Sequence, residues 1–331
     1  MNQKILKAWT RLSMIANEFV HKARYFSFSY GIYSTAWWLG WYVHPLKRLC
    51  MWGFKHKDKY VKNYLFQNYT GPIDLYRKNL GVDMVSVSLD EYPIWVFWFQ
   101  GFEFAPPLVQ ACFENLKRKN KNVIAIDKNN LDTYLQLPSY IKQKVVEGKI
   151  TFTHYSDIIR VSLLAEYGGM WIDATCFTST EMPKSAKERA FYSSKTVNQN
   201  PLPLWSNSRW CGWGQGTCYK HYPLFVFLKD ILYTYWKQEN LLIDYLLLDA
   251  VMEIGIEENQ RVHEDMDSLP TNNLQRNNLW LLMNQTFSMD KYKELTNDTW
   301  LYKLSYKTQL QEMTESGEET FYKKILNQDL N

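Results

Sequence analysis

The sequence has only five cysteines in 331 residues, and their pattern offers no disulfide framework. They stand at positions 50, 112, 176, 211 and 218, so they are odd in number and form no C-x-x-C pair. Small secreted domains that depend on disulfides usually carry an even set of closely spaced cysteines. The sequence therefore favours a reduced protein that faces the cytosol.

Several nucleotide-binding and targeting signals are missing as well. The chain contains neither G-x-G-x-x-G nor G-x-x-x-x-G-K-[ST], which argues against a dinucleotide fingerprint and a Walker ATPase. It has no signal-peptide pattern, because its apolar stretch begins late and lacks a clear cleavage site. No repeat or low-complexity linker divides it. The composition, 46% hydrophobic and 22% charged, is that of an ordinary globular protein with one large domain and an appendage, or with two domains.

Charged residues are absent from position 25 to position 46, and basic residues flank this stretch on both sides. It is long enough to span a bilayer, but its serines, His44 and Pro45 make it too polar for a confident transmembrane prediction. Its aromatic residues are of the types that prefer membrane interfaces: Tyr30, Tyr33, Trp37, Trp38, Trp41 and Tyr42.

The overall charge of +4 hides a strong asymmetry along the chain. Residues 1–62 carry 11 Lys and Arg against Glu18 and Asp58, a net charge of +9, so the remaining 269 residues have a net charge of −5. A basic, aromatic segment is typical of contact with an anionic membrane surface. The alternative is a set of helices packed on the body with solvated lysines. No nucleic-acid-binding motif accompanies the charge, so we expect no nucleic acid partner.

Apolar runs of strand length alternate with helical patterns in the body of the chain. The strands are expected at 94–99, 122–127 and 150–153, and the helices at 106–119 and 131–147. Such alternation with short connections predicts an α/β fold with a mostly parallel sheet and right-handed crossovers. We expect residues 1–90 to form a helical N-terminal extension and residues 91–331 to form the main domain.

The stretch 156–175 is the most informative part of the sequence. It predicts a helix that starts at Ser156, a turn at Gly168-Gly169 where positive φ is needed, and a buried strand that ends at Asp173. Ligands of open α/β sheets bind beyond the carboxyl ends of the strands, where Asp173 would lie.

Three segments together resemble the capsular polysaccharide synthesis proteins, relatives of the family-32 glycosyltransferases: Pro93–Gly101, Ser156–Arg160 and Tyr167–Asp173. The resemblance implies a GT-A-like, Rossmann-type fold. It implies a nucleotide-sugar-dependent hexosyltransferase that acts with retention on a capsular or other cell-surface polysaccharide. The partners would be a nucleoside-diphosphate sugar, an oligosaccharide or lipid-linked glycan acceptor and an anionic membrane. The site of action would be peripheral, at the cytoplasmic face of a bacterial cell membrane.

The resemblance also implies roles for individual residues. Asp157, Arg160 and Asp173 would be catalytic and contact the sugar donor. The other donor-binding residues would be Val96, Phe97, Trp98, Gln100, Gly101, Trp171, Lys303 and Lys307. Candidates for the acceptor are Trp205, Trp210, Trp213, Asp244 and Asp249.

The expected cofactor is a divalent cation, Mn²⁺ or Mg²⁺, at Asp173 and Thr175. Thr175 stands where relatives often have a second carboxylate, and a hydroxyl is a poor ligand for a hard cation. If this change weakens metal binding, Lys303 or Lys307 would supply the charge that stabilises the leaving diphosphate. Two other functions stay open: a non-catalytic carbohydrate- or membrane-binding scaffold that has lost its metal site, and a phosphohydrolase with Asp173 as nucleophile. The phosphohydrolase lacks the second Asp of the usual D-x-D-x-T motif.

Overall fold

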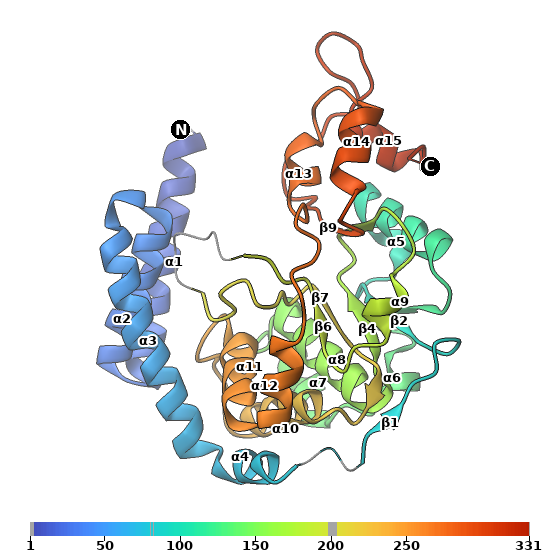
Figure 1. The fold of residues 1–331 in the computed structure, drawn as a ribbon. Helices are drawn as coiled ribbons and strands as arrows, with labels where there is room; N and C mark the ends of the chain where they lie inside the picture. Colours follow the sequence, from blue (N-terminus) through green and yellow to red (C-terminus); the bar gives the residue numbers. More distant parts are fainter. Residues whose placement is uncertain (1–2, 80, 82, 198–203, 331) are drawn as a thin grey trace.

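The structure is a computed structural model that describes residues 3–79, 81, 83–197 and 204–330, with the side chains of residues 3–8 and 44 left out (Figure 1). It has a mixed α/β architecture around one five-stranded sheet. The strand order is β3 (Val123–Ile126), β2 (Ile94–Phe97), β4 (Gly169–Ile172), β7 (Gly214–Thr217) and β6 (Tyr192–Ser193).

The sheet is parallel on one side and antiparallel on the other. Strands β3, β2 and β4 run parallel, whereas β7 is antiparallel to both β4 and β6. The expectation of a mostly parallel sheet is therefore right for only half of it. The sequence of β7, Gly-Gln-Gly-Thr, has no apolar residue and was missed for that reason. It fits because Gly216 has no side chain: a Cβ there would lie 2.9 Å from the Gly169 carbonyl oxygen.

The helix that leads into β4 starts earlier than expected. Helix α8 (Phe152–Tyr167) is capped by Thr151, whose side chain accepts a hydrogen bond from the His154 backbone N–H. The strand predicted at 150–153 is wrong, because these residues form the cap and the first turn of α8. The glycine turn is confirmed: φ is +66° at Gly168 and +90° at Gly169.

Helices pack on the sheet and form the main hydrophobic core together with it. Helix α8 lies against β2 and β4, and α10 (Pro223–Gln238) packs on α8 and on α11 (Leu247–Glu258). The single helix expected at 131–147 is two shorter ones, α6 (Leu131–Tyr134) and α7 (Ser139–Val146), because Pro138 separates them. The other elements around the sheet are α5 (Pro107–Lys119), α9 (Lys184–Lys187), α12 (Gln260–Asp267) and the β1–β8 pair (Val85–Ser86, Tyr219–Lys220).

The C-terminal part has a core of its own, seen at the top of Figure 1. Strand β9 (Leu301–Lys303) pairs antiparallel with β5 (Cys176–Thr178), with Lys303 opposite Cys176. Helices α13 (Asn278–Leu282), α14 (Met289–Thr296) and α15 (Phe321–Leu326) pack around this pair and α5. The β5–β9 ladder brings residue 303 next to the end of β4.

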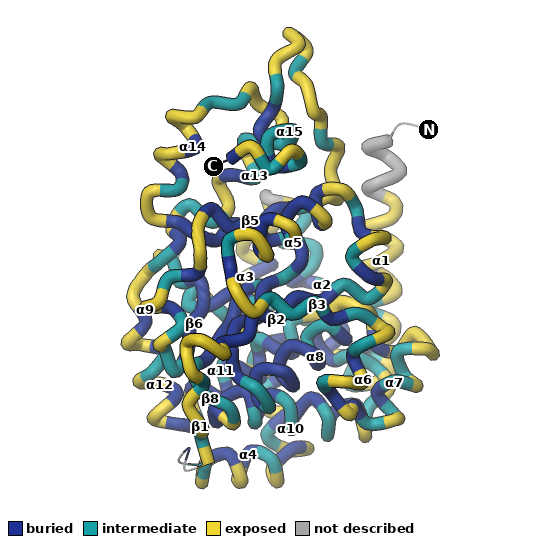
Figure 2. The backbone as a smooth tube through the Cα atoms, turned by 90° about the vertical axis from the view of Figure 1, so that its right-hand side faces the viewer, coloured by how far each residue is buried: buried dark blue, intermediate teal, exposed yellow. Residues whose placement is uncertain are grey.

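The N-terminal helices form a layer at one side of the body (Figure 1). They are α1 (Gln3–Tyr25), α2 (Phe28–Tyr42), α3 (Lys47–Asn68) and α4 (Thr70–Arg77). Of these, α3 and α4 contact α11, and buried side chains of α2, α3 and α4 join the main core. In α1, by contrast, most of the residues whose burial is described are exposed (Figure 2). Lys57 of α3 makes a buried ion pair with Asp244. None of the described helices is both long and apolar enough to cross a membrane. The division of the chain at residue 90 stays a prediction.

Candidate active site

A cavity of about 650 Å³ opens at the carboxyl ends of β2 and β4. This is the edge at which parallel α/β sheets bind ligands. Its walls come from five segments far apart in the sequence: residues 97–100, 152–160 of α8, 171–175, Tyr245, and 303–307. Of the predicted residues, the lining includes Phe97, Trp98, Gln100, Asp157, Arg160, Trp171, Asp173, Thr175, Lys303 and Lys307.

Asp173 lies at the centre of a hydrogen-bond network at the end of β4. Its Oδ1 accepts a hydrogen bond from Trp171 Nε1 at 2.9 Å, and its Oδ2 lies 2.6 Å from Lys303 Nζ. Its backbone N–H donates to the Trp213 carbonyl oxygen at 2.9 Å, which fixes the turn. The side chains of Asp173 and Lys303 are 30% and 29% exposed, so the pair reaches the cavity.

The charges around this pair keep both groups ionised. Burial raises the pKa of the Asp173 carboxyl, but the charges of Lys303 and Arg160 outweigh burial, and the net pKa is lowered. Burial lowers the pKa of Lys303, but Asp173 and Cys176 outweigh it, and the net pKa is raised.

Asp157 and Arg160 lie one turn apart on α8 and form an ion pair. Arg160 also donates to the Gly212 carbonyl oxygen, and its guanidinium lies 5.5 Å from the centre of the Trp171 ring. The Arg160 side chain is only 6% exposed and that of Asp157 is 16% exposed, so this is not a solvated surface pair. The buried His154, 3.4 Å from Asp157 through Nδ1, was missed because one His in a helix gives no signal.

Asp249 is a second acidic group near Asp157. It accepts a hydrogen bond from Trp210 Nε1 at 2.6 Å. Burial raises the pKa of its carboxyl to about 6; the charge of Asp157 also raises it, whereas the Trp210 hydrogen bond and Arg160 lower it. Asp249 therefore gains a proton at a higher pH than an ordinary exposed aspartate does.

Several predicted residues lie away from the cavity. Trp205 and Trp210 are 4% and 1% exposed, so their rings have no free face on which an acceptor sugar could stack. Trp213 is half-buried and faces the Arg276 guanidinium. Asp244 is held by Lys57 in the core, and Val96, Gly101 and Asp249 are absent from the lining.

The C-terminal run 303–307 forms one wall of the cavity. The Leu304 N–H donates to the Thr175 carbonyl oxygen at 3.0 Å, and the Tyr306 ring lies 5.8 Å from that of Trp98. Tyr306 and Tyr245 were missed. Tyr306 lies between the predicted residues Lys303 and Lys307, and Tyr245 directly follows the predicted Asp244, so each had a signal nearby in the sequence.

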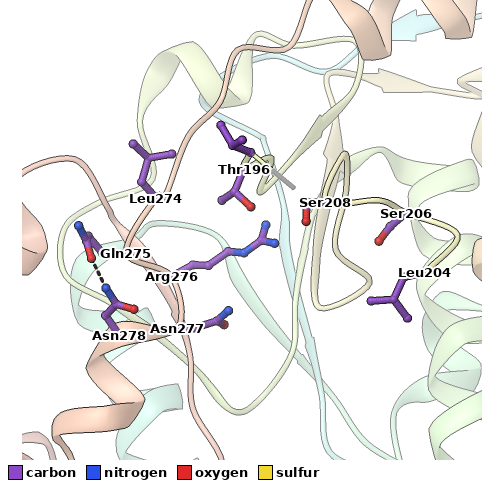
Figure 3. A pocket seen from close by; sticks show the side chains of 10 residues that line it. Thr196, Leu204, Ser206, Ser208, Leu274, Gln275, Arg276, Asn277 and Asn278 are labelled. Atoms are coloured by element: carbon purple, nitrogen blue, oxygen red, sulfur yellow. Dashed lines mark hydrogen bonds between the residues drawn. The ribbon is translucent and has the colours of Figure 1, made fainter. Parts of the chain in front are cut away.

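A second cavity, of about 740 Å³, has polar walls (Figure 3). Arg276 extends between its two sides and donates to the Ser194 carbonyl oxygen at 2.6 Å. The lining includes Thr196, Ser206, Ser208, Gln275, Asn277 and Asn278. Two other lining residues, Val197 and Leu204, flank in sequence residues 198–203, which lie outside the described residues, and we assign the cavity no role.

The predicted metal ligands are a poor match for a divalent cation. Mg²⁺ and Ca²⁺ favour several carboxylate or carbonyl oxygens, but Asp173 carries the Lys303 ammonium and Thr175 offers only a neutral hydroxyl. In the part of the chain that the structure describes, no three His, Cys, Asp or Glu side chains form a group that could hold a metal ion. We therefore do not assign Asp173 and Thr175 to a metal site.

The cavity at the strand ends has two acidic residues, Arg160, two lysines and aromatic walls, a composition suited to a polar ligand with anionic groups. The chain belongs to the capsular polysaccharide synthesis protein family, whose sequence model matches residues 51–325.

One curated relative is an O-glycosyltransferase, braB, of Annulohypoxylon truncatum. It is 29% identical over 118 residues, which cover 29% of this chain and 28% of the relative. The chain thus matches under a third of that protein's length. No solved structure matches the chain.

Proposed function

We propose that the protein is a glycosyltransferase that moves a sugar from a nucleoside-diphosphate donor to a growing capsular or other cell-surface polysaccharide. The observation that carries the proposal is the Asp173–Lys303 pair in a strand-end cavity of a capsular polysaccharide synthesis protein. The relative named as an O-glycosyltransferase supports the reaction type. A GT-A-like arrangement of the three parallel strands is part of the proposal.

The cavity has charged side chains for both the diphosphate and the sugar of such a donor. The bond between the anomeric carbon and the diphosphate oxygen breaks with its electron pair on the diphosphate, while the acceptor hydroxyl oxygen bonds to the anomeric carbon. Lys303 and Lys307 offer positive charge to the departing diphosphate, and fixed charges of this kind are usually the largest catalytic term. Asp157, which lines the cavity, offers negative charge to the sugar as it becomes cationic.

Retention of the anomeric configuration fits the same site. In a same-face displacement the acceptor proton passes to the departing diphosphate oxygen, so no separate general base is required. The rings of Trp98 and Tyr306 supply apolar faces on which a nucleobase can stack.

The rival functions have less support. A phosphohydrolase of this type uses a second Asp two residues after the nucleophile, but residue 175 is a Thr, and Asp173 is paired with Lys303. A non-catalytic scaffold would bind glycans or membranes without releasing nucleotide, so the assay below separates it from a transferase.

The assay measures nucleotide release from UDP- and GDP-sugars by the full chain, with and without Mn²⁺. We expect slow donor hydrolysis, and we expect the Asp173→Asn variant to lose at least tenfold in rate because it weakens the hold on Lys303. Lys184→Met, at an exposed lysine far from the cavity lining, is the control. No nucleotide release and no donor binding by calorimetry would refute the transferase and favour the scaffold.

We also propose that the protein lies peripherally at the cytoplasmic face of a bacterial membrane. The N-terminal helices support contact with a membrane surface. Among the residues that the structure describes, 24 large apolar side chains are exposed, and 11 of them lie between residues 9 and 52. Trp9 and Phe28 are each 66% exposed, within the segment whose net charge is +9. Apolar side chains among basic ones are the combination that binds anionic interfaces.

Sedimentation with vesicles tests this position. The full chain should bind vesicles that contain phosphatidylglycerol and not vesicles of phosphatidylcholine alone. The double variant Trp9→Ala and Phe28→Ala should lose at least half of the binding, whereas Val146→Ala, an 88% exposed residue on α7, should bind like the unaltered chain. Equal binding by all three proteins would refute the membrane role of these helices.

A further inference from the structure

We propose that Lys303 takes the place of a divalent metal ion, so that the protein binds the diphosphate of its donor without metal. The proposal rests on the proposed function, because it concerns the diphosphate of the same donor. It assigns two roles: Lys303 contacts the phosphate oxygens, and Asp173 positions Lys303.

The backbone around Lys303 is fixed on both sides. Lys303 lies opposite Cys176 in the β5–β9 ladder, and its own N–H donates to the Arg276 carbonyl oxygen at 2.8 Å. The next residue, Leu304, bonds to Thr175 at 3.0 Å. The lysine therefore starts from a rigid strand directly beside the 173–175 turn, where the missing second carboxylate would stand.

The acidic side chain that a metal would need is already paired. Asp173 Oδ2 lies 2.6 Å from Lys303 Nζ, and Asp157 is paired with Arg160. A divalent cation at Asp173 would have to displace the ammonium and then remain next to it, with repulsion between the two positive charges. In the Asp173–Lys303 pair, the lysine ammonium thus takes the position that a metal ion would have beside the carboxylate.

The ammonium remains able to bind a phosphate while it is paired with Asp173. A lysine ammonium has three donors, and Asp173 uses one of them. The Lys303 side chain is 29% exposed toward the cavity, and Lys307 lines the same wall four residues later. The raised pKa of Lys303 is consistent with a charge that persists at neutral pH.

Calorimetric titration of the full chain with UDP and with GDP tests the inference. In EDTA the unaltered chain should bind one of the two nucleotides, and added Mn²⁺ should change its Kd by less than about twofold. Lys303→Met should weaken binding at least tenfold, Lys303→Arg should retain most of it, and Lys184→Met should bind like the unaltered chain.

The unaltered chain alone can overturn the inference, whether or not the variants fold. If EDTA abolishes nucleotide binding and Mn²⁺ restores it, the site depends on metal; the inference fails while the proposed function stands. If neither nucleotide binds under either condition, the proposed function fails as well. Unchanged affinity in a folded Lys303→Met protein would also overturn the role of Lys303.

Discussion

The buried ion pair between Lys57 and Asp244 gives a sharp prediction about stability. The two side chains are 1% and 2% exposed, and they join α3 to the loop before α11. Lys57→Met keeps the length and much of the volume of the side chain but leaves Asp244 buried without its ion-pair partner. Removal of one partner from a buried pair costs about 3–5 kcal/mol, because the remaining charge loses both water and its partner.

The expected loss is large in proportion to the whole protein. Domains unfold with a free energy of about 5–15 kcal/mol, so this single change would remove a substantial fraction. The double variant Lys57→Met and Asp244→Asn should recover most of the loss, because no uncompensated charge remains. The Leu246 N–H can still donate to the amide oxygen of an Asn at 244, as it now does to Asp244 Oδ1 at 2.8 Å.

Urea unfolding followed by tryptophan fluorescence at pH 7 measures these differences. The matched control is Lys142→Met, which breaks an exposed pair with Asp132 whose side chains are 40% and 65% exposed. Exposed pairs contribute about 0–1 kcal/mol. A loss in Lys57→Met no larger than that in Lys142→Met would refute the reasoning, as would a double variant no more stable than the single one.

The turn at Gly168-Gly169 and the carboxyl of Asp249 give two further predictions. Gly169→Ala should cost at least about 3 kcal/mol, because the residue has φ +90° and its Cβ would lie 2.3 Å from the Pro93 carbonyl oxygen. Gly148→Ala, at φ +72° with open space around it, should cost only about 1 kcal/mol in the same urea titration; equal losses would contradict the close approach. The pKa of Asp249 is raised to about 6, so the folded state holds a proton that the unfolded state releases near pH 4. Stability from this group is complete below pH 4 and falls as the pH rises through 6, by about 1–2 kcal/mol after allowance for its partial exposure. Asp249→Asn should remove that pH-dependent part, and an unchanged difference in unfolding free energy between pH 4 and pH 7 would show that another group is responsible.

The parts of the fold that could be predicted are those with strong local signals. Two consecutive glycines after an apolar helix predict the turn at 168–169, and the apolar run behind them predicts β4 and the place of Asp173. The same holds for β2 and for β3. In each case the residues themselves determine the conformation, so the sequence alone was sufficient.

The parts that could not be predicted depend on contacts between distant residues. Strand β7 is a strand only because β4 and β6 pair with it. Trp205 and Trp210 were predicted as residues that contact the acceptor, but both lie in the core, with Lys57 near Trp205 and Asp249 bonded to Trp210. The distance between Asp173 and Lys303 is set by the β5–β9 ladder, which no local pattern reveals across 130 positions of sequence.

That ladder has a consequence for how the protein is made. A chain leaving the ribosome exposes α8 and β4 long before β9, so Asp173 is in place well before its lysine has been synthesised. Until residues 301–307 arrive, the cavity lacks an entire wall together with both of its lysines. A product that stops short of this strand could fold most of its main sheet and still have no complete site. Residues 301–307 thus determine when the cavity of the newly made protein becomes complete.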